Sequence, residues 1–77
     1  MPDQETLTAE QIQTHYDAAL DSVTLINDLM ALDSRDDEQT ATVARNVEHL
    51  QIMVAKDYWT SDQPLAPLNA AITAGQA

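Results

Sequence analysis

Residues 43–59, VARNVEHLQIMVAKDYW, carry the pattern around which the rest of the chain is organised. Apolar side chains recur there at spacings of four, three and four, which places them in one stripe along a helix of about 3.6 residues per turn. A second apolar group, formed by Ile52, Ala55 and Trp59, falls on the opposite side of the same helix. A helix with apolar residues on two sides needs two neighbours, so we expect this segment to contact more than one element. The main stripe consists of Val43, Val47, Leu50 and Val54.

The second apolar group has two interpretations. Either the C-terminal segment of the chain covers Ile52 and Trp59, or these residues dock another protein. The C-terminal segment predicts a short helix over about 65–74, with Pro67 suited to its first turn and Gly75 suited to a C-terminal cap. A helix of this length is not stable alone in water, so it must lie on something. The candidate partner-binding residues are therefore Ile52, Ala55, Trp59, Leu65, Leu68 and Ile72.

The first predicted helix runs from about 9 to about 32. Thr8, followed by Gln11 three residues later, predicts a capping box at its start. Beyond that start, apolar residues alternate spacings of four and three, which indicates a buried seam. The seam residues are Ile12, Tyr16, Ala19, Val23, Ile26 and Met30.

The opposite side of this first helix is acidic. Its acids recur two residues out of step with the seam, and two residues correspond to about 200° around a helix. Toward the helix end, Leu25, Leu29 and Leu32 widen the apolar band, so we expect the C-terminal half to be the more deeply buried part. The acidic residues are Glu10, Asp17, Asp21 and Asp28.

Residues 33–38, DSRDDE, interrupt the helical pattern. A short polar connection between two apolar-faced helices folds them back on each other as an antiparallel pair. We therefore expect an all-α fold, an antiparallel helical hairpin over about 9–32 and 37–59 followed by the short helix over about 65–74. Two capping pairs are compatible with the start of the second helix, namely Ser34 with Asp37 and Asp36 with Gln39.

The acidic connection does not fit a calcium loop. An EF-hand loop needs acidic or amide oxygens at alternate positions and a glycine at the sixth. Counted from Asp33, Arg35 occupies a ligand position and Glu38 occupies the glycine position. We expect no metal here.

The length and charge of the chain limit its domain organisation and the classes of partner that it can bind. The chain has 77 residues, no Cys, and thirteen Asp and Glu against three Lys and Arg, for a net charge of −10. Such a surface repels nucleic-acid phosphates and anionic membranes, whereas it attracts basic proteins. We expect one small helical domain over residues 1–77, of which residues 1–7 form an extended arm with no signal-peptide pattern. A core this small is marginal alone, so association with copies of itself or with other chains is the expected support.

Acid–base chemistry has little basis in this sequence. His15 and His49 are the only imidazoles, and their acidic neighbours Asp17 and Glu48 are two and one residues away, which on a helix places each pair about 100° or more apart. General acid–base catalysis needs groups that converge on one point. We therefore expect no enzyme activity and no cofactor, and His49 is expected to pack at the edge of the main stripe.

The C-terminal half resembles short uncharacterised proteins of tailed bacteriophages. The resemblance lies in RNVEHL (45–50), AKDYWT (55–60) and PLNAAITAG (67–75), within residues 45–77. It implies a virion or host-cytoplasm setting and transfers no site residue. Two functions follow as hypotheses: a minor structural or assembly component of a phage particle, or an acidic inhibitor whose carboxylates imitate phosphates on a basic host nucleic-acid-binding protein.

Overall fold

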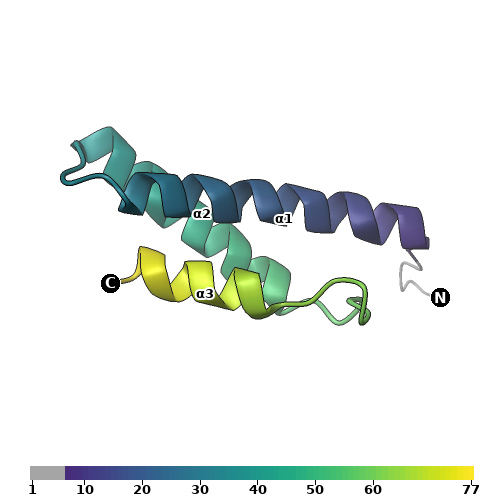
Figure 1. Ribbon diagram of the computed structural model, residues 1–77. Coiled ribbons are helices and arrows are strands. Elements are labelled where there is room, and N and C mark those ends of the chain that lie inside the picture. The colour runs from purple at the N-terminus through teal and green to yellow at the C-terminus, as the bar shows by residue number, and fades with distance from the viewer. Residues whose placement is uncertain (1–6) are drawn as a thin grey trace.

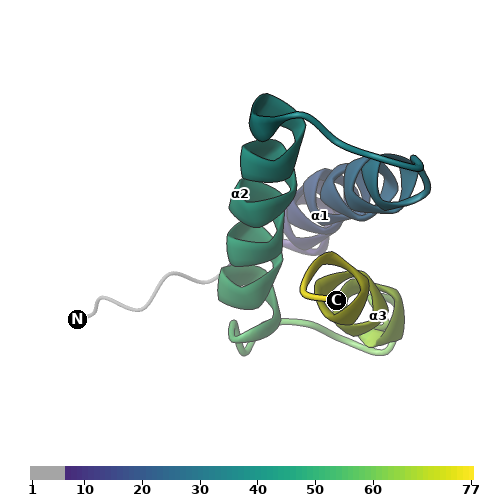
Figure 2. The same ribbon diagram turned by 90° about the vertical axis from the view of Figure 1, so that its left-hand side faces the viewer.

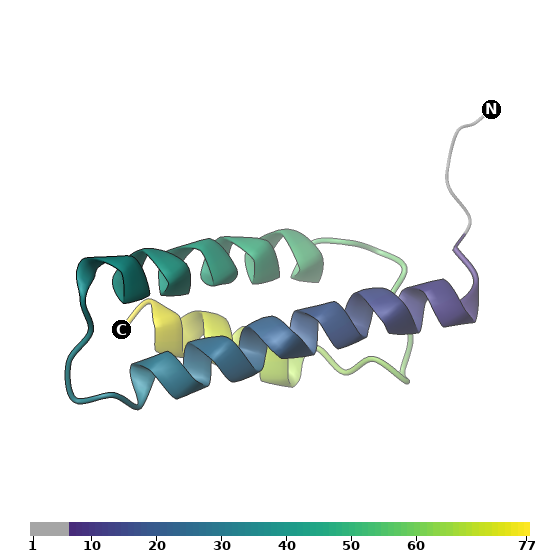
Figure 3. The same cartoon turned by 90° about the horizontal axis from the view of Figure 1, so that it is seen from above.

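A computed structural model describes residues 7–77 of the chain, which form three helices and, within that range, no strand (Figure 1). They are α1 (Ala9–Met30), α2 (Asp37–Val54) and α3 (Ala66–Gly75). α1 and α2 run in opposite directions, and α3 returns alongside them in the direction of α1 (Figure 3). The predicted all-α fold, a hairpin followed by a short helix, is confirmed. Of the predicted arm, residues 1–6 lie outside the described residues.

The start of α1 follows the predicted capping box. The Gln11 backbone N–H donates to Thr8 Oγ1 at 3.1 Å, and the Thr8 N–H donates to Gln11 Oε1 at 2.9 Å. Both bonds satisfy amides that have no partner within the helix. At the other end α1 stops at Met30, and the Arg35 guanidinium donates to the Leu29 and Leu32 carbonyls at 3.1 and 3.3 Å. A cation there is favourable because the last carbonyls carry partial negative charge.

Hydrogen bonds at the start of α2 show which of the two predicted capping pairs is present. The Gln39 N–H donates to an Asp36 carboxylate oxygen at 2.7 Å, and the Asp36 N–H donates to Gln39 Oε1 at 3.0 Å. Asp36 with Gln39 is therefore the capping pair, and Ser34 with Asp37 is not. The two acids that follow, Asp37 and Glu38, lie in the first turn, where the helix dipole favours them.

The predicted end of α2 is wrong. The helix stops at Val54 rather than at Tyr58 or Trp59. The Lys56 N–H bonds to the Met53 carbonyl at 3.1 Å, a tight three-residue turn in place of a further helical turn. The Trp59 indole N–H then donates to the same Met53 oxygen at 2.8 Å. A side chain from beyond the helix thus satisfies a terminal carbonyl, and residues 55–59 leave the helical path.

All three helices contribute to one core. Ile26 of α1, Leu50 of α2 and Leu68 of α3 are fully buried. In the C-terminal half of α1, Leu29 and Met30 are partly buried, but Leu25 is exposed, as is Leu32 just after the helix, so the buried apolar band is narrower than predicted. The buried apolar cluster comprises Tyr16, Ala19, Ile26, Val43, Val47, Leu50, Met53, Leu68 and Ala71.

Gly75 is the point of closest approach between α3 and the hairpin. A Cβ added there would clash with Val47 Cγ2 and would lie 3.3 Å from Ile26 Cγ2 and from Val43 Cγ1. The glycine does not adopt a positive φ, and it is the last residue of α3 rather than the C-terminal cap that was predicted. Because glycine has no side chain, α3 can lie in the angle between α1 and α2 (Figure 2).

Candidate protein-interaction surface

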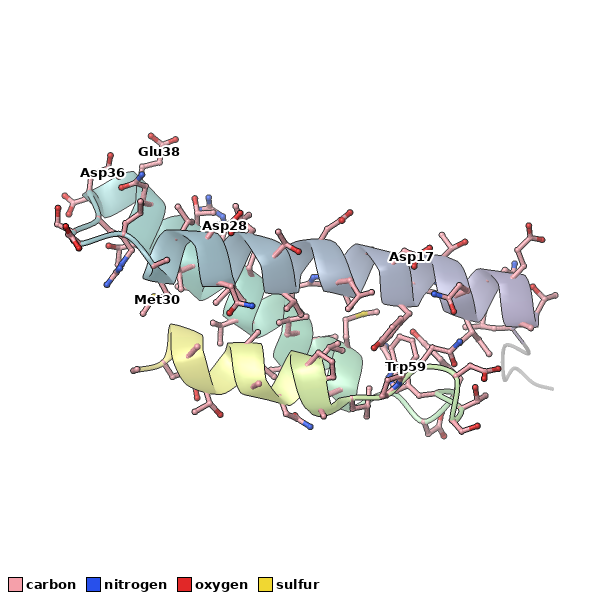
Figure 4. All side chains as sticks on the ribbon, in the orientation of Figure 1. Asp17, Asp28, Met30, Asp36, Glu38 and Trp59 are labelled. Atoms are coloured by element: carbon pink, nitrogen blue, oxygen red, sulfur yellow. The ribbon has the colours of Figure 1, made fainter. Side chains whose placement is uncertain are left out.

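The Trp59 side chain is partly buried by contacts within its own chain. Its ring lies between α1 and the connection that follows α2 (Figure 4), with an edge-on contact to Tyr16 at a centroid distance of 5.8 Å. Tyr58 contacts it from the same connection at 4.7 Å. The indole N–H is used by Met53, and the ring is partly buried against the core. Trp59 is thus partly buried by its own chain through Tyr16 of α1 and Tyr58, whereas the prediction assigned its cover to the C-terminal segment.

The connection between α2 and α3 is fixed to α1 by side-chain hydrogen bonds that the sequence did not indicate. Tyr16 donates its hydroxyl hydrogen to the Pro64 carbonyl at 2.7 Å. The buried Gln63 donates to Gln13 Oε1 at 3.0 Å and accepts from the Thr60 hydroxyl at 2.8 Å. Polar residues next to a proline have the composition of an ordinary loop, so only the fold identifies Gln63 as a structural residue.

Ile52 and Ala55 are exposed. The Ile52 side chain retains 54% of its accessible surface, so the C-terminal segment does not cover it. It stands on the outer side of α2, opposite the buried stripe. Ala55, the C-cap residue three positions after Ile52, is exposed beside it, whereas Trp59 lies beyond the end of α2 and does not continue this apolar face as predicted.

The three candidates in the last segment belong to the core or its border. Leu68 has no accessible surface, and Leu65 and Ile72 are partly buried against the same cluster. A partner could reach Leu68 only if α3 left the hairpin. The six predicted residues therefore do not form one continuous surface, and their binding of a partner stays a prediction.

A different set of exposed residues lies along α1. Leu25 retains 39% of its surface and Leu32, just after the helix, retains 43%. Asp21 and Asp28 flank Leu25 at spacings of four and three, so the three side chains are neighbours on one helix side. We call Asp21, Leu25, Asp28 and Leu32 the Leu25 edge. Sequence reasoning missed it because Leu25 and Leu32 were expected to be buried.

The Leu25 edge lies on the side of α1 that borders α2. Ser22, three residues before Leu25, is buried and its hydroxyl is 2.8 Å from His49 Nδ1 of α2. His49 thus packs at the border of the main stripe, as predicted. The acids of α1 continue around the helix from this border, and Asp17 and Asp28 project from the side facing away from α3 (Figure 4).

Both histidines contact side chains from another part of the fold. His49 faces the Ser22 hydroxyl, and the His15 ring stacks at a tilt near Tyr58 with centroids 5.9 Å apart. Every buried side-chain nitrogen or oxygen of residues 7–77 has a hydrogen-bond partner, and those residues contain no group of three or more His, Cys, Asp or Glu able to hold a metal ion. A groove of about 400 Å³ between α2 and the end of α3 is open and is lined by Arg45, Glu48 and Gly75 among others. It brings together no set of groups suited to acid–base chemistry.

Comparison with known proteins adds no relative. No protein family, curated protein or solved structure matches the chain. Within the described range, no helix is long and apolar enough to cross a membrane. Function is therefore inferred from the chemistry of the surface.

Proposed function

We propose that this chain is a non-enzymatic acidic interaction protein that acts by binding other protein chains. The observation that carries the proposal is the exposure of Leu25, Leu32 and Ile52 on a hairpin whose core is otherwise closed. Single exposed apolar residues are common, but the exposure of Leu25 and Leu32 close to the carboxylates of α1 supports a contact surface. A small core that gains little from its own burial gains more from such contacts.

The setting we propose is a phage particle. The resemblance of residues 45–77 to short tailed-phage proteins supports a minor structural or assembly component that packs on copies of itself or on larger capsid or tail subunits. The dense negative charge supports binding to a basic subunit surface rather than to nucleic acid or to a membrane.

The test is the location and assembly state of the full chain. Quantitative mass spectrometry of purified particles should find it at a fixed copy number, and analytical ultracentrifugation should find it associated with itself or with a particle subunit. A chain that remains monomeric with every purified subunit and is absent from particles would overturn the proposal.

The second candidate function is an acidic inhibitor that imitates nucleic-acid phosphates. The observation that favours it is the exposed series of acids on α1, a helix without any Lys or Arg. Such an inhibitor would compete with DNA for a basic host protein, and its binding would weaken steeply with salt. Competition by duplex DNA for the partner distinguishes it from an assembly component, which DNA should not displace.

A further inference from the structure

We propose that the Leu25 edge binds a cationic amphipathic helix of another protein, with the leucines contacting the apolar face of that helix and the aspartates contacting its lysines or arginines. The proposal rests on the proposed interaction function and names the chemistry of the partner. It is carried by the geometry, exposure and charge of this edge.

The spacing of the edge suits a helix. Asp21, Leu25 and Asp28 lie four and three residues apart, a heptad-like row on the outside of α1. Leu29, one turn after Leu25, is partly buried and extends the apolar strip toward the core. A second helix packed along α1 could therefore place its own apolar row over Leu25 and Leu29, with charged positions beside it.

The carboxylates of the edge are available. Within residues 7–77, neither the Asp21 nor the Asp28 carboxylate forms a hydrogen bond or an ion pair, whereas the Asp17 carboxylate accepts a hydrogen bond from Gln13. The nearest cation along the chain beyond α1 is Arg35, and its guanidinium already donates to the Leu29 and Leu32 carbonyls. The edge therefore has negative charge that the chain itself does not neutralise, next to exposed leucine.

Charge decides between possible occupants. A second copy of this chain docked through the same edge would bring its own Asp21 and Asp28 toward these carboxylates, which is unfavourable for like charges at short range. An anionic membrane surface is repelled for the same reason. A helix with lysine or arginine beside its apolar row satisfies both requirements, because apolar burial supplies affinity and opposite charge supplies orientation.

The experiment measures binding of the full chain to a synthetic helical peptide with Leu at the a and d positions and Lys at e and g. An otherwise identical peptide with Glu in place of Lys is the control for charge, and a shuffled Lys peptide is the control for helix periodicity. We expect the Lys peptide to bind and the other two to bind at least about tenfold more weakly.

Variants then test the edge itself. Leu25→Gln/Leu32→Gln should weaken binding by about tenfold or more, whereas Ile52→Gln, which removes a more exposed apolar side chain from α2, should leave it unchanged. Asp21→Asn/Asp28→Asn should weaken binding and reduce its salt dependence. Glu48→Gln/Asp57→Asn removes two exposed charges elsewhere and should have the smaller effect. Because the substituted side chains are exposed, circular dichroism should show unchanged helix content.

Four outcomes would overturn the proposal. These are no measurable binding of the Lys peptide, equal binding of the Glu or shuffled peptide, equal binding by the Leu25→Gln/Leu32→Gln variant and the unaltered chain, and a dimer of the unaltered chain that the leucine substitutions dissociate. The proposed function fails separately. If the Leu25→Gln/Leu32→Gln chain still enters particles at the normal copy number, the assembly role is supported and the assignment of the Leu25 edge as the docking surface is wrong. If the unaltered chain binds the peptide but never enters particles, the docking surface is supported and the particle role is wrong.

Discussion

The two connections between helices are built on different principles. Residues 31–36, between α1 and α2, are exposed apart from Arg35, and their hydrogen bonds reach no further than six residues along the chain. Residues 55–65, between α2 and α3, carry two aromatic rings and the buried Gln63, and they bond to α1 across 48 and 50 residues. The first connection only has to reverse the chain. The second also has to position α3, which is too short to hold its own place.

This difference gives the second connection the larger share of the stability. We predict that Trp59→Ala lowers the free energy of unfolding by about 3 kcal/mol, because the change removes a partly buried indole, its contact with Tyr16 and its bond to the Met53 carbonyl. Urea unfolding followed by far-ultraviolet circular dichroism measures this loss. Trp59→Phe, which keeps a ring but no N–H, should lose about 1 kcal/mol. A Trp59→Ala chain as stable as the parent would show that the aromatic contacts contribute nothing.

The far end of α3 provides the next test. Gly75→Ala should destabilise the protein by about 2 kcal/mol, because the added methyl meets the stiff β-branched Val47, although alanine is the better helix former. Val47→Ala should relieve the clash, so that a double-mutant cycle gives a coupling energy of about 1 kcal/mol. Stabilisation by Gly75→Ala alone would mean that α3 does not approach α2 this closely.

A smaller loss is expected at the first connection. Asp36→Ala removes the side-chain bond to the Gln39 amide and should cost about 1 kcal/mol, whereas Asp36→Ser keeps a capping oxygen and should cost a few tenths. The same unfolding measurement applies. Ser34→Ala is the matched control, because Ser34 does not cap α2, and it should be silent. Equal losses for Ser34→Ala and Asp36→Ala would contradict the assigned cap.

Arg35 should have the smallest effect. Its side chain donates to two carbonyls at the end of α1, one of them partly buried, and Arg35→Gln should cost about 0.5 kcal/mol, decreasing in high salt. A loss as large as that of Trp59→Ala would mean that both connections contribute equally to the free energy of unfolding, which would contradict the predicted difference between them.

The features predicted correctly from the sequence depend on contacts between residues a few positions apart, and the features that were missed depend on contacts between elements distant in the sequence. The capping box at Thr8 was predicted because its partner lies three residues away. The end of α2 was missed because it depends on Trp59 reaching back to Met53 and on Tyr16 supporting that ring from another helix. The candidate surface was missed for a related reason, since periodicity gives the apolar width of a helix and not how much of that width its neighbours cover. Leu25 and Leu68 look equivalent in sequence, yet one is exposed and the other fully buried.

The sequence by itself determined the helices, the point at which α1 begins, the approximate start of α2 with two capping pairs left open, and the stripes of α1 and α2 that form the core, because these depend on interactions within about one helical turn. Only the tertiary structure decided where α2 ends, why position 75 is glycine, and which leucines remain in contact with water. The physical reason is that burial and steric fit are properties of pairs of surfaces, and the partner surface here comes from residues about 50 positions away along the chain.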